Sequence, residues 1–276
     1  FGRSVYISGM SAALDDLLDL MRHLRAPDGG CPWDRQQTPA TLVRHTLEEA
    51  YEVADCIQRE DWAALPGELG DLLFQVVFYA QIGAEQGRFD FERVCRSLVD
   101  KLTRRHPHVF GGEAVRDADG QATRWEQIKA AERTAAARHS ALDDVPLALP
   151  ALSRAQKLQQ RAARVGFDWP ALPPVLDKLR EETHELEAAL TAGEADGIAH
   201  EIGDLLFTCV NLARHLGLDA EASLRSANAR FESRFRAVEA QAVAAGEALD
   251  RLAPDALDAL WEAAKSAEIA QKKRVP

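Results

Sequence analysis

The chain has 276 residues, and its 46% hydrophobic and 28% charged content is typical of a soluble globular protein. A formal net charge of −11 argues against nucleic acid as the main partner, because neutralising a phosphate backbone needs clustered Lys and Arg. No apolar stretch approaches the roughly 18 residues of a membrane span, and the four cysteines show no zinc-like spacing, so we expect a cytoplasmic protein without membrane association.

Apolar residues recur at helical spacing along nearly the whole chain, and no segment alternates like a β-strand. Ser11 is a candidate N-cap of a first helix, and because Met10 precedes this helix start, we expect residues 1–10 to be a leader or added segment. Asp90 is the candidate N-cap of a later helix. The helices predicted next lie at 40–59, 62–86, 91–105 and 123–137.

The prolines of residues 138–150 indicate a linker between two domains. The helices predicted beyond it lie at 151–164, 174–191, 195–216, 220–245 and 254–270. We therefore predict an all-α fold with tandem duplicated helical-bundle domains, residues 11–137 and 151–276.

An acidic motif occurs twice, and every acid of the second copy lies 133 residues after its counterpart. Each copy is symmetric about a midpoint, which is Glu60 in the first and Gly193 in the second. If each midpoint is the turn of an antiparallel helical hairpin, the acids of its two helices face one another. The acids of the two copies are Glu48, Glu49, Glu52, Glu68 and Asp71, and Glu181, Glu182, Glu185, Glu201 and Asp204.

Several carboxylates on one seam between helices predict a metal site. Two like charges about 5 Å apart repel by about 3 kcal/mol at an effective dielectric near 20. Mg²⁺, with Mn²⁺ as an alternative, offsets such repulsion and commonly bridges carboxylates to substrate phosphates. A solvated acidic face is the competing interpretation, which the repetition at identical spacing disfavours. The predicted ligands are Glu182, Glu185, Glu201 and Asp204 in the second domain and Glu49, Glu52, Glu68 and Asp71 in the first. Glu48 and Glu181 are candidates for outer or second-metal ligands, or only surface charge.

Basic residues of the second copy suit a phosphorylated ligand. Lys178 lies one turn before Glu182, where its ammonium can reach a phosphate, and its first-copy counterpart is His45. Arg230 and Arg234 are one turn apart and can bind a polyphosphate bidentately, although such pairs are commonly solvated surface charge.

Three motifs that contain a tryptophan or histidine are open to different interpretations. Trp261 and Lys265 are one turn apart and can receive a base and a phosphate, although a Trp at this spacing is commonly a core residue. The His106-Pro107-His108 segment is expected to be a structured loop, and Glu181-x-x-His184 is only half of a di-iron signature.

The chain resembles the MazG family in its two-domain bacterial form. The hairpin sequences at residues 47–52 and 68–74 carry this resemblance, and so do Gly30–Asp34, Arg104–Phe110, Arg124–Lys129, Val165–Trp169 and Asn211–His215. The resemblance implies a homodimeric, Mg²⁺-dependent nucleoside triphosphate pyrophosphohydrolase that converts NTPs such as ATP, and dNTPs, to monophosphate and pyrophosphate in nucleotide-pool house-cleaning.

By the family motif, Glu182, Glu185, Glu201 and Asp204 hold the metal, and Lys178, Arg230, Arg234, Trp261 and Lys265 contact the nucleotide. This sequence departs from the pattern at Arg230, where Lys is also common, and at His45, which replaces the Lys of the second copy. We therefore expect the second domain to be catalytic.

The expected reaction is attack by a water on the α-phosphorus, with Glu182 or Glu181 as candidate base. The alternatives are a nucleotide- or alarmone-sensing regulator without turnover, an interaction scaffold, and a narrower dUTP or dCTP pyrophosphatase.

Overall fold

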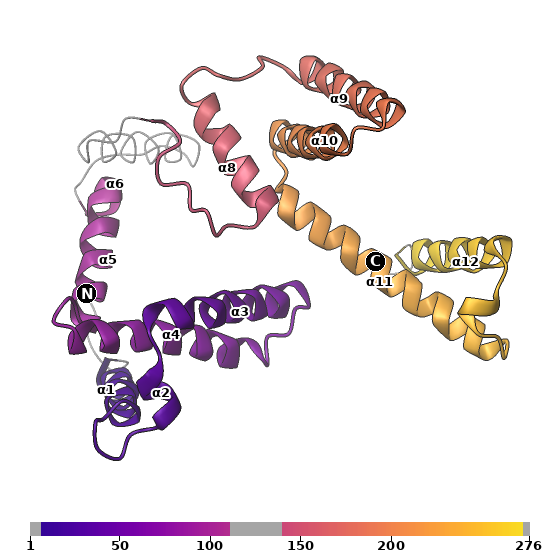
Figure 1. The fold of residues 1–276 in the computed structure, drawn as a ribbon. Coiled ribbons are helices and arrows are strands. Elements are labelled where there is room, and N and C mark those ends of the chain that lie inside the picture. Colours follow the sequence, from indigo (N-terminus) through magenta and orange to yellow (C-terminus); the bar gives the residue numbers. More distant parts are fainter. Residues whose placement is uncertain (1–6, 111–139, 273–276) are drawn as a thin grey trace. The chain divides into compact units, whose positions relative to one another are not determined.

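A computed structural model describes residues 7–110 and 140–272 of the chain, with side chains described from residue 12 to residue 270 (Figure 1). Every regular element in these ranges is helical, which confirms the predicted all-α class. The chain divides into two compact units, residues 1–130 and 131–276. Among the described helices, none has the length and apolar character that a bilayer crossing requires.

The first unit contains six described helices. They are α1 (Ile7–Leu24), α2 (Pro32–Gln36), α3 (Pro39–Gln58), α4 (Leu65–Glu85), α5 (Phe91–Arg105) and α6 (Pro107–Phe110). Asp90 caps α5 by accepting a hydrogen bond from the Arg93 backbone N–H at 2.7 Å, as predicted. The prediction that Ser11 caps the first helix is wrong, because α1 already begins at Ile7. The expected loop around His108 is also wrong, since Pro107 begins a one-turn helix, a position where a missing N–H costs nothing.

The core of the first unit lies where α1, α3 and α4 meet. Met21 of α1, Leu42 of α3, and Phe78 and Ile82 of α4 are at most 2% exposed and form one cluster. Burying such side chains contributes about 1.5–3 kcal/mol each. This cluster holds α3 and α4 together, and these two helices carry the first set of acids.

The second unit repeats the helical plan. Its helices are α8 (Ala151–Ala163), α9 (Leu172–Ala192), α10 (Ala195–His215), α11 (Ala220–Ala244), the 3₁₀ turn η1 (Leu249–Arg251) and α12 (Pro254–Lys272). α10 packs against α9 and α8, and α12 packs against α11. The helix predicted at 123–137 lies outside the described residues.

Candidate metal and nucleotide site

Each acidic motif lies on an antiparallel helical hairpin whose turn coincides with the midpoint of the motif. Glu60 lies between α3 and α4 with φ of 56°, and Gly193 lies between α9 and α10 with φ of 71°. A left-handed residue at the helix end reverses the chain direction, and the Gly193 N–H donates to the Ala189 carbonyl at 3.0 Å. The two helices of each hairpin therefore run side by side with their acids in register.

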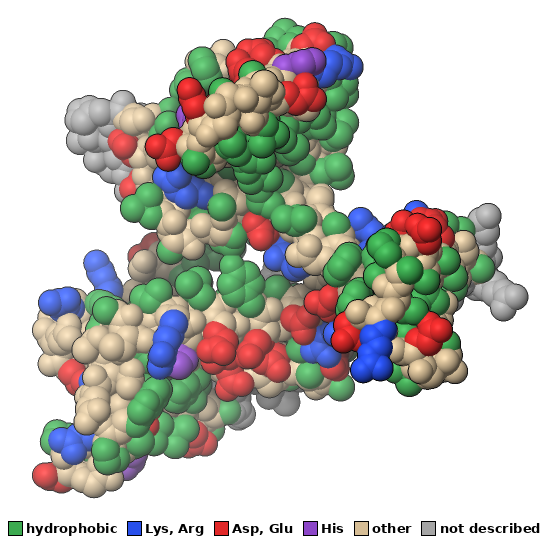
Figure 2. Space-filling view, turned by 45° about the vertical axis from the view of Figure 1, so that its right-hand side comes forward, with side chains coloured by type: hydrophobic (Ala, Val, Ile, Leu, Met, Phe, Trp, Pro, Cys, Tyr) green, Lys and Arg blue, Asp and Glu red, His purple; other side chains and the backbone are tan. Residues whose placement is uncertain are grey.

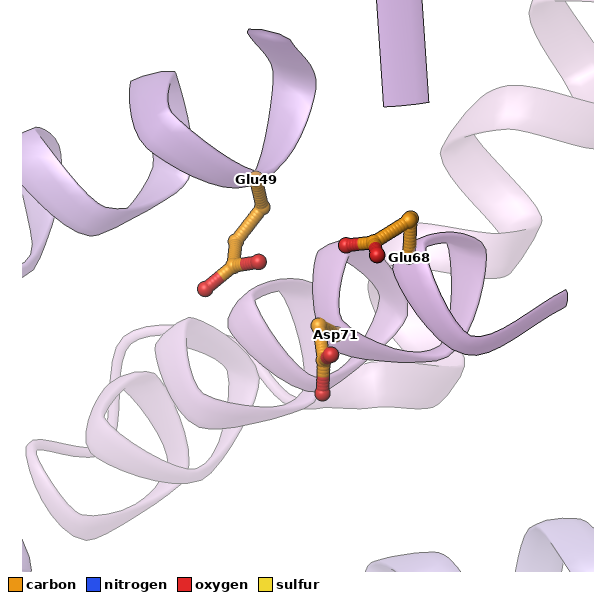
Figure 3. Close-up of side chains that lie close together, drawn as sticks. All are labelled: Glu49, Glu68 and Asp71. Carbon is orange, nitrogen blue, oxygen red and sulfur yellow. The ribbon is translucent and has the colours of Figure 1, made fainter. Parts of the chain in front are cut away.

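In the first unit, three acids converge across the α3–α4 hairpin. Glu49 projects from one helix, and Glu68 and Asp71 project from the other (Figure 3). One carboxylate oxygen of each residue lies within 4.8 Å of the other two. Partial burial raises the pKa of Glu49, and the neighbouring charges of Glu52 and Asp71 raise it further. This crowding of negative charge is what a bound cation would relieve.

In the second unit, Glu182, Glu201 and Asp204 converge in the same way, within 4.8 Å of one another. Glu182 is only 4% exposed, so its charge needs a partner. Lys178 provides one, with Nζ 2.9 Å from Glu182 Oε1 and 2.8 Å from Glu181 Oε1. Hydrogen bonds to Glu181 and Glu182 raise the pKa of Lys178 well above its usual value, so it is fully charged at neutral pH.

The fourth acid predicted for each group, Glu52 in the first unit and Glu185 in the second, is exposed and lies outside the converging trio. Each follows its trio member on the same helix by three residues and therefore shares its face. An exposed carboxylate turns freely between rotamers, so a ligand seated on the trio remains within its reach. The structure thus brings three of four predicted ligands together in each unit.

Sequence reasoning missed His200. Its Nε2 lies 3.2 Å from Asp204 Oδ2, one turn away on α10. The i,i+4 spacing of His and Asp on a helix was the available signal. In the first unit, His45 Nδ1 lies 3.6 Å from Glu48 Oε2, and its ring lies edge-on to Trp33 at 5.9 Å.

The other predicted nucleotide-contacting residues gather on the α11–α12 pair. The Arg234 guanidinium lies 5.9 Å from the centroid of the Trp261 ring, and Arg234 Nε donates to Glu268 Oε2 at 2.7 Å. Lys265 pairs with Glu262 at 2.7 Å, and Arg230 donates to the Ser226 hydroxyl at 3.0 Å. We call Arg230, Arg234, Trp261 and Lys265 the basic-aromatic cluster.

The basic-aromatic cluster and the acidic trio lie on different helix pairs. α12 packs against α11, whereas the trio lies between α9 and α10. Lys178 therefore lies beside the acidic trio, whereas Arg230, Arg234 and Lys265 lie on the same helix pair as Trp261. The first-copy counterparts Trp125 and Lys129 lie outside the described residues.

The fold and the two acidic hairpins define an all-α protein with a duplicated candidate metal site. The model of the MazG nucleotide pyrophosphohydrolase domain matches the chain twice, at residues 37–110 and 174–239, and each match contains one acidic hairpin. The chain belongs to the MazG family and is a hydrolase, which confirms the resemblance seen in its motifs.

Three relatives match over at least 90% of this chain. The nucleoside triphosphate pyrophosphohydrolase of Escherichia coli K12 is 52% identical over 258 residues, which cover 93% of this chain and 98% of the relative. The Thermotoga maritima protein named nucleoside triphosphate pyrophosphohydrolase/pyrophosphatase MazG is 41% identical over 255 residues, covering 92% and 96%. The uncharacterized Bacillus subtilis protein YabN is 40% identical over 250 residues, which cover 90% of this chain but 51% of YabN.

Proposed function

We propose that this chain hydrolyses nucleoside triphosphates, both ribo- and deoxyribonucleotides, to monophosphate and pyrophosphate at the acidic trio of the second unit. The observation that carries the proposal is the convergence of Glu182, Glu201 and Asp204 beside the charged Lys178. This arrangement supports the proposal because it combines oxygen acceptors for a cation with a hydrogen-bond donor for a phosphate. We further propose a house-cleaning role in the nucleotide pool of the cytoplasm, which a broad substrate range would suit.

The residues present fit a divalent cation such as Mg²⁺. The trio offers hard oxygen donors from three carboxylates, and Glu185 follows Glu182 by three residues on the same helix. In the matching trio of the first unit, partial burial raises the pKa of Glu49, and the neighbouring charges of Glu52 and Asp71 raise it further. When bound, Mg²⁺ supplies positive charge to the triphosphate and lowers the pKa of a coordinated water.

The residues of the second unit have distinct tasks in the proposed reaction. Lys178 gives up its hydrogen bond to Glu181 and donates to a phosphate oxygen instead. Glu181 is exposed, so its side chain is free to turn away. Glu181 then accepts the proton of the attacking water. The water oxygen bonds to the α-phosphorus, the bond from that phosphorus to the α–β bridging oxygen breaks, and pyrophosphate leaves. In this scheme Glu182, which is buried and can only accept hydrogen bonds, would hold the cation and would not act as the base.

We also propose a homodimer in which the basic-aromatic cluster of one copy reaches the triphosphate held by another. Large apolar side chains remain exposed on the α10 and α11 surfaces, including Ile202, Leu206 and Phe235. The space-filling view likewise has hydrophobic side chains spread over the visible face between acidic groups (Figure 2). Exposed apolar surface of this kind favours association.

The first unit is proposed to support or regulate the second. Its trio is complete, but His45 stands where the second unit has Lys178, and an imidazole is a shorter and weaker phosphate donor. Nucleotide sensing without turnover is the second candidate for this unit alone.

The test is pyrophosphate release from a panel of NTPs and dNTPs with Mg²⁺, using the unaltered chain, Glu201→Ala and Glu68→Ala. Glu187→Ala is the matched control, because Glu187 is an exposed acid of α9 outside the trio. We expect Glu201→Ala to lose at least 100-fold of the rate, on the order of the loss for a group that stabilises the transition state directly. Loss only in Glu68→Ala would move catalysis to the first unit, and no release from the unaltered chain would reject the proposal.

A further inference from the structure

A cavity of about 600 Å³ opens in the second unit between the loop at residues 165–169, α8 and α10. Its walls include the aromatic rings of Phe167, Trp169 and Phe207. No member of the acidic trio lines it. Its volume lies within the range of small-molecule sites, and apolar walls with few polar groups are the usual composition of such sites. This pocket, which we call the loop pocket, is therefore a site distinct from the candidate metal centre.

One wall of the loop pocket holds an oriented amide. Asn211 is 5% exposed, and its Oδ1 accepts hydrogen bonds from Arg214 Nε at 2.9 Å and from Arg214 Nη2 at 2.7 Å. Because a guanidinium only donates, Oδ1 must face Arg214, and Nδ2 must point elsewhere. Nδ2 has no hydrogen-bond partner among the described residues. Because Asn211 lines the loop pocket, a ligand that accepts a hydrogen bond can pair with this donor there.

A carboxylate lies next to this amide. Asp168 Oδ2 accepts from Arg214 Nη1 at 2.9 Å, and Asp168 Oδ1 accepts from Arg214 Nη2 at 2.5 Å and lies 3.1 Å from His215 Nε2. Oδ2 thus has a second lone pair available for an N–H of a ligand. Since Asp168 and Arg214 neutralise each other, none of the described residues that line the loop pocket offers a free positive charge to a phosphate.

The matching positions of the first unit are packed with apolar side chains, whereas the second unit has the loop pocket there. At the offset of 133 residues, Asn211 corresponds to Phe78 and His215 to Ile82. Phe78 and Ile82 are 1% and 2% exposed and fill the core of the first unit with Met21. Protein interiors are close-packed, so a filled core is the stable solution at these positions. The second unit has polar side chains and an open cavity there instead.

We propose that the loop pocket binds the base of a purine nucleoside, at a second site separate from the metal centre. Adenine presents N7 as a ring acceptor beside its N6–H donor, and guanine presents N3 beside its N2–H donor, and either edge matches the Asn211 amide donor and the Asp168 acceptor. Its flat faces stack on Phe167, Trp169 or Phe207. The absence of a free cation favours recognition of the base over recognition of the phosphates.

Adenosine and guanosine are the probes, because they carry no phosphate that would report on the metal centre. Their affinity is measured by isothermal titration calorimetry with the full chain in EDTA. We expect saturable binding that Phe167→Ala weakens at least ten-fold, while Val165→Ala leaves it unchanged. Both side chains are exposed, at 82% and 68%, and belong to the same loop, but only Phe167 lines the loop pocket. Neither truncation removes a core side chain.

Asn211→Leu is the second variant, and it keeps the side-chain volume while removing the amide. We expect it to abolish binding, and its helical circular dichroism signal checks that it folds. No binding of either nucleoside at millimolar concentration would overturn the proposal. Equal affinity in Phe167→Ala, or equal binding of cytidine and uridine, would also overturn it. If Phe167→Ala loses the dimer but keeps its affinity for the nucleosides, the pocket is an interface between copies, and this result would also overturn the proposal. Because no metal or triphosphate is present, these outcomes are independent of the pyrophosphate test.

Discussion

Glu60 and Gly193 occupy the same place in the two halves, 133 residues apart, and both have left-handed backbone conformations, with φ of 56° and 71°. Each ends the first helix of an acidic hairpin and so sets how the second helix returns. Glycine adopts this conformation freely, whereas a residue with a Cβ is strained by roughly 1–2 kcal/mol. The first unit thus maintains its hairpin with a strained residue where the second unit has a glycine.

Substitutions at the two turns are expected to have opposite effects on stability. Glu60→Gly removes the strain, which outweighs the extra freedom of the unfolded chain, so we expect a gain of roughly 0.5 kcal/mol. Gly193→Ala introduces the strain, and because an added Cβ would meet no atom within 4 Å, the loss of roughly 0.5–1 kcal/mol is purely conformational. Urea unfolding measures both free energies, and stabilisation by Gly193→Ala would contradict the argument.

The convergence of the acids was predictable because it depends on local geometry alone. Helical spacing fixes which acids share a face, and symmetry about Glu60 and Gly193 fixes which faces meet. The start of α5 was predictable for a similar reason, since Asp90 is a strong N-cap.

Features that depend on tertiary packing were not predictable. Ser11 is a separate, local case, because serine is tolerated inside a helix as well as at a cap, and α1 extends through it to Ile7. The position of Arg234 and Trp261 away from the acidic trio follows from the packing of α12 on α11, which no spacing reveals. The loop pocket required the same information, because Asp168 and Arg214 are 46 residues apart in sequence.

Metal binding is expected to raise thermal stability through the trios. A cation bound at 100 times its dissociation constant adds about 2.7 kcal/mol to the free energy of unfolding. We expect the melting temperature to rise from EDTA to Mg²⁺, with the rise reduced in Glu182→Gln and further reduced when Glu49→Gln is added. Glu187→Gln is the control that should retain the full rise. If the double variant kept the full rise in melting temperature, the cation would have to bind at a site other than the two trios.

Lys178 is expected to stabilise the metal-free protein by neutralising the buried Glu182. Lys178→Met leaves that carboxylate without its cation, and we expect a loss of about 2 kcal/mol in EDTA, less than for a fully buried pair because Lys178 is partly exposed. With Mg²⁺ present, the bound cation takes over the neutralisation, so the rise in melting temperature from EDTA to Mg²⁺ should be larger than in the unaltered chain. Arg180→Met is the matched control, because Arg180 pairs with the exposed Asp177 on the same helix and with no other acid among the described residues. A smaller Mg²⁺ effect in Lys178→Met would show that Lys178 does not compensate for the absent metal.

The pairing of Asp168 with Arg214 predicts a pH dependence of stability. The hydrogen bond from Arg214 holds the pKa of Asp168 below its usual range, and the contact with His215 lowers it further. Since the pKa is lower in the folded than in the unfolded chain, the pair stabilises the fold above the ordinary Asp value near 3.8 and loses this effect as the pH falls through the folded value. Asp168→Asn should therefore cost roughly 1–2 kcal/mol at pH 7, and its difference from the unaltered chain should shrink towards pH 2. Asp177→Asn, in an exposed pair with Arg180, should have almost no effect at either pH. Urea unfolding at both pH values measures these differences, and a cost for Asp168→Asn that stays constant with pH would show that the side chain acts through shape rather than charge.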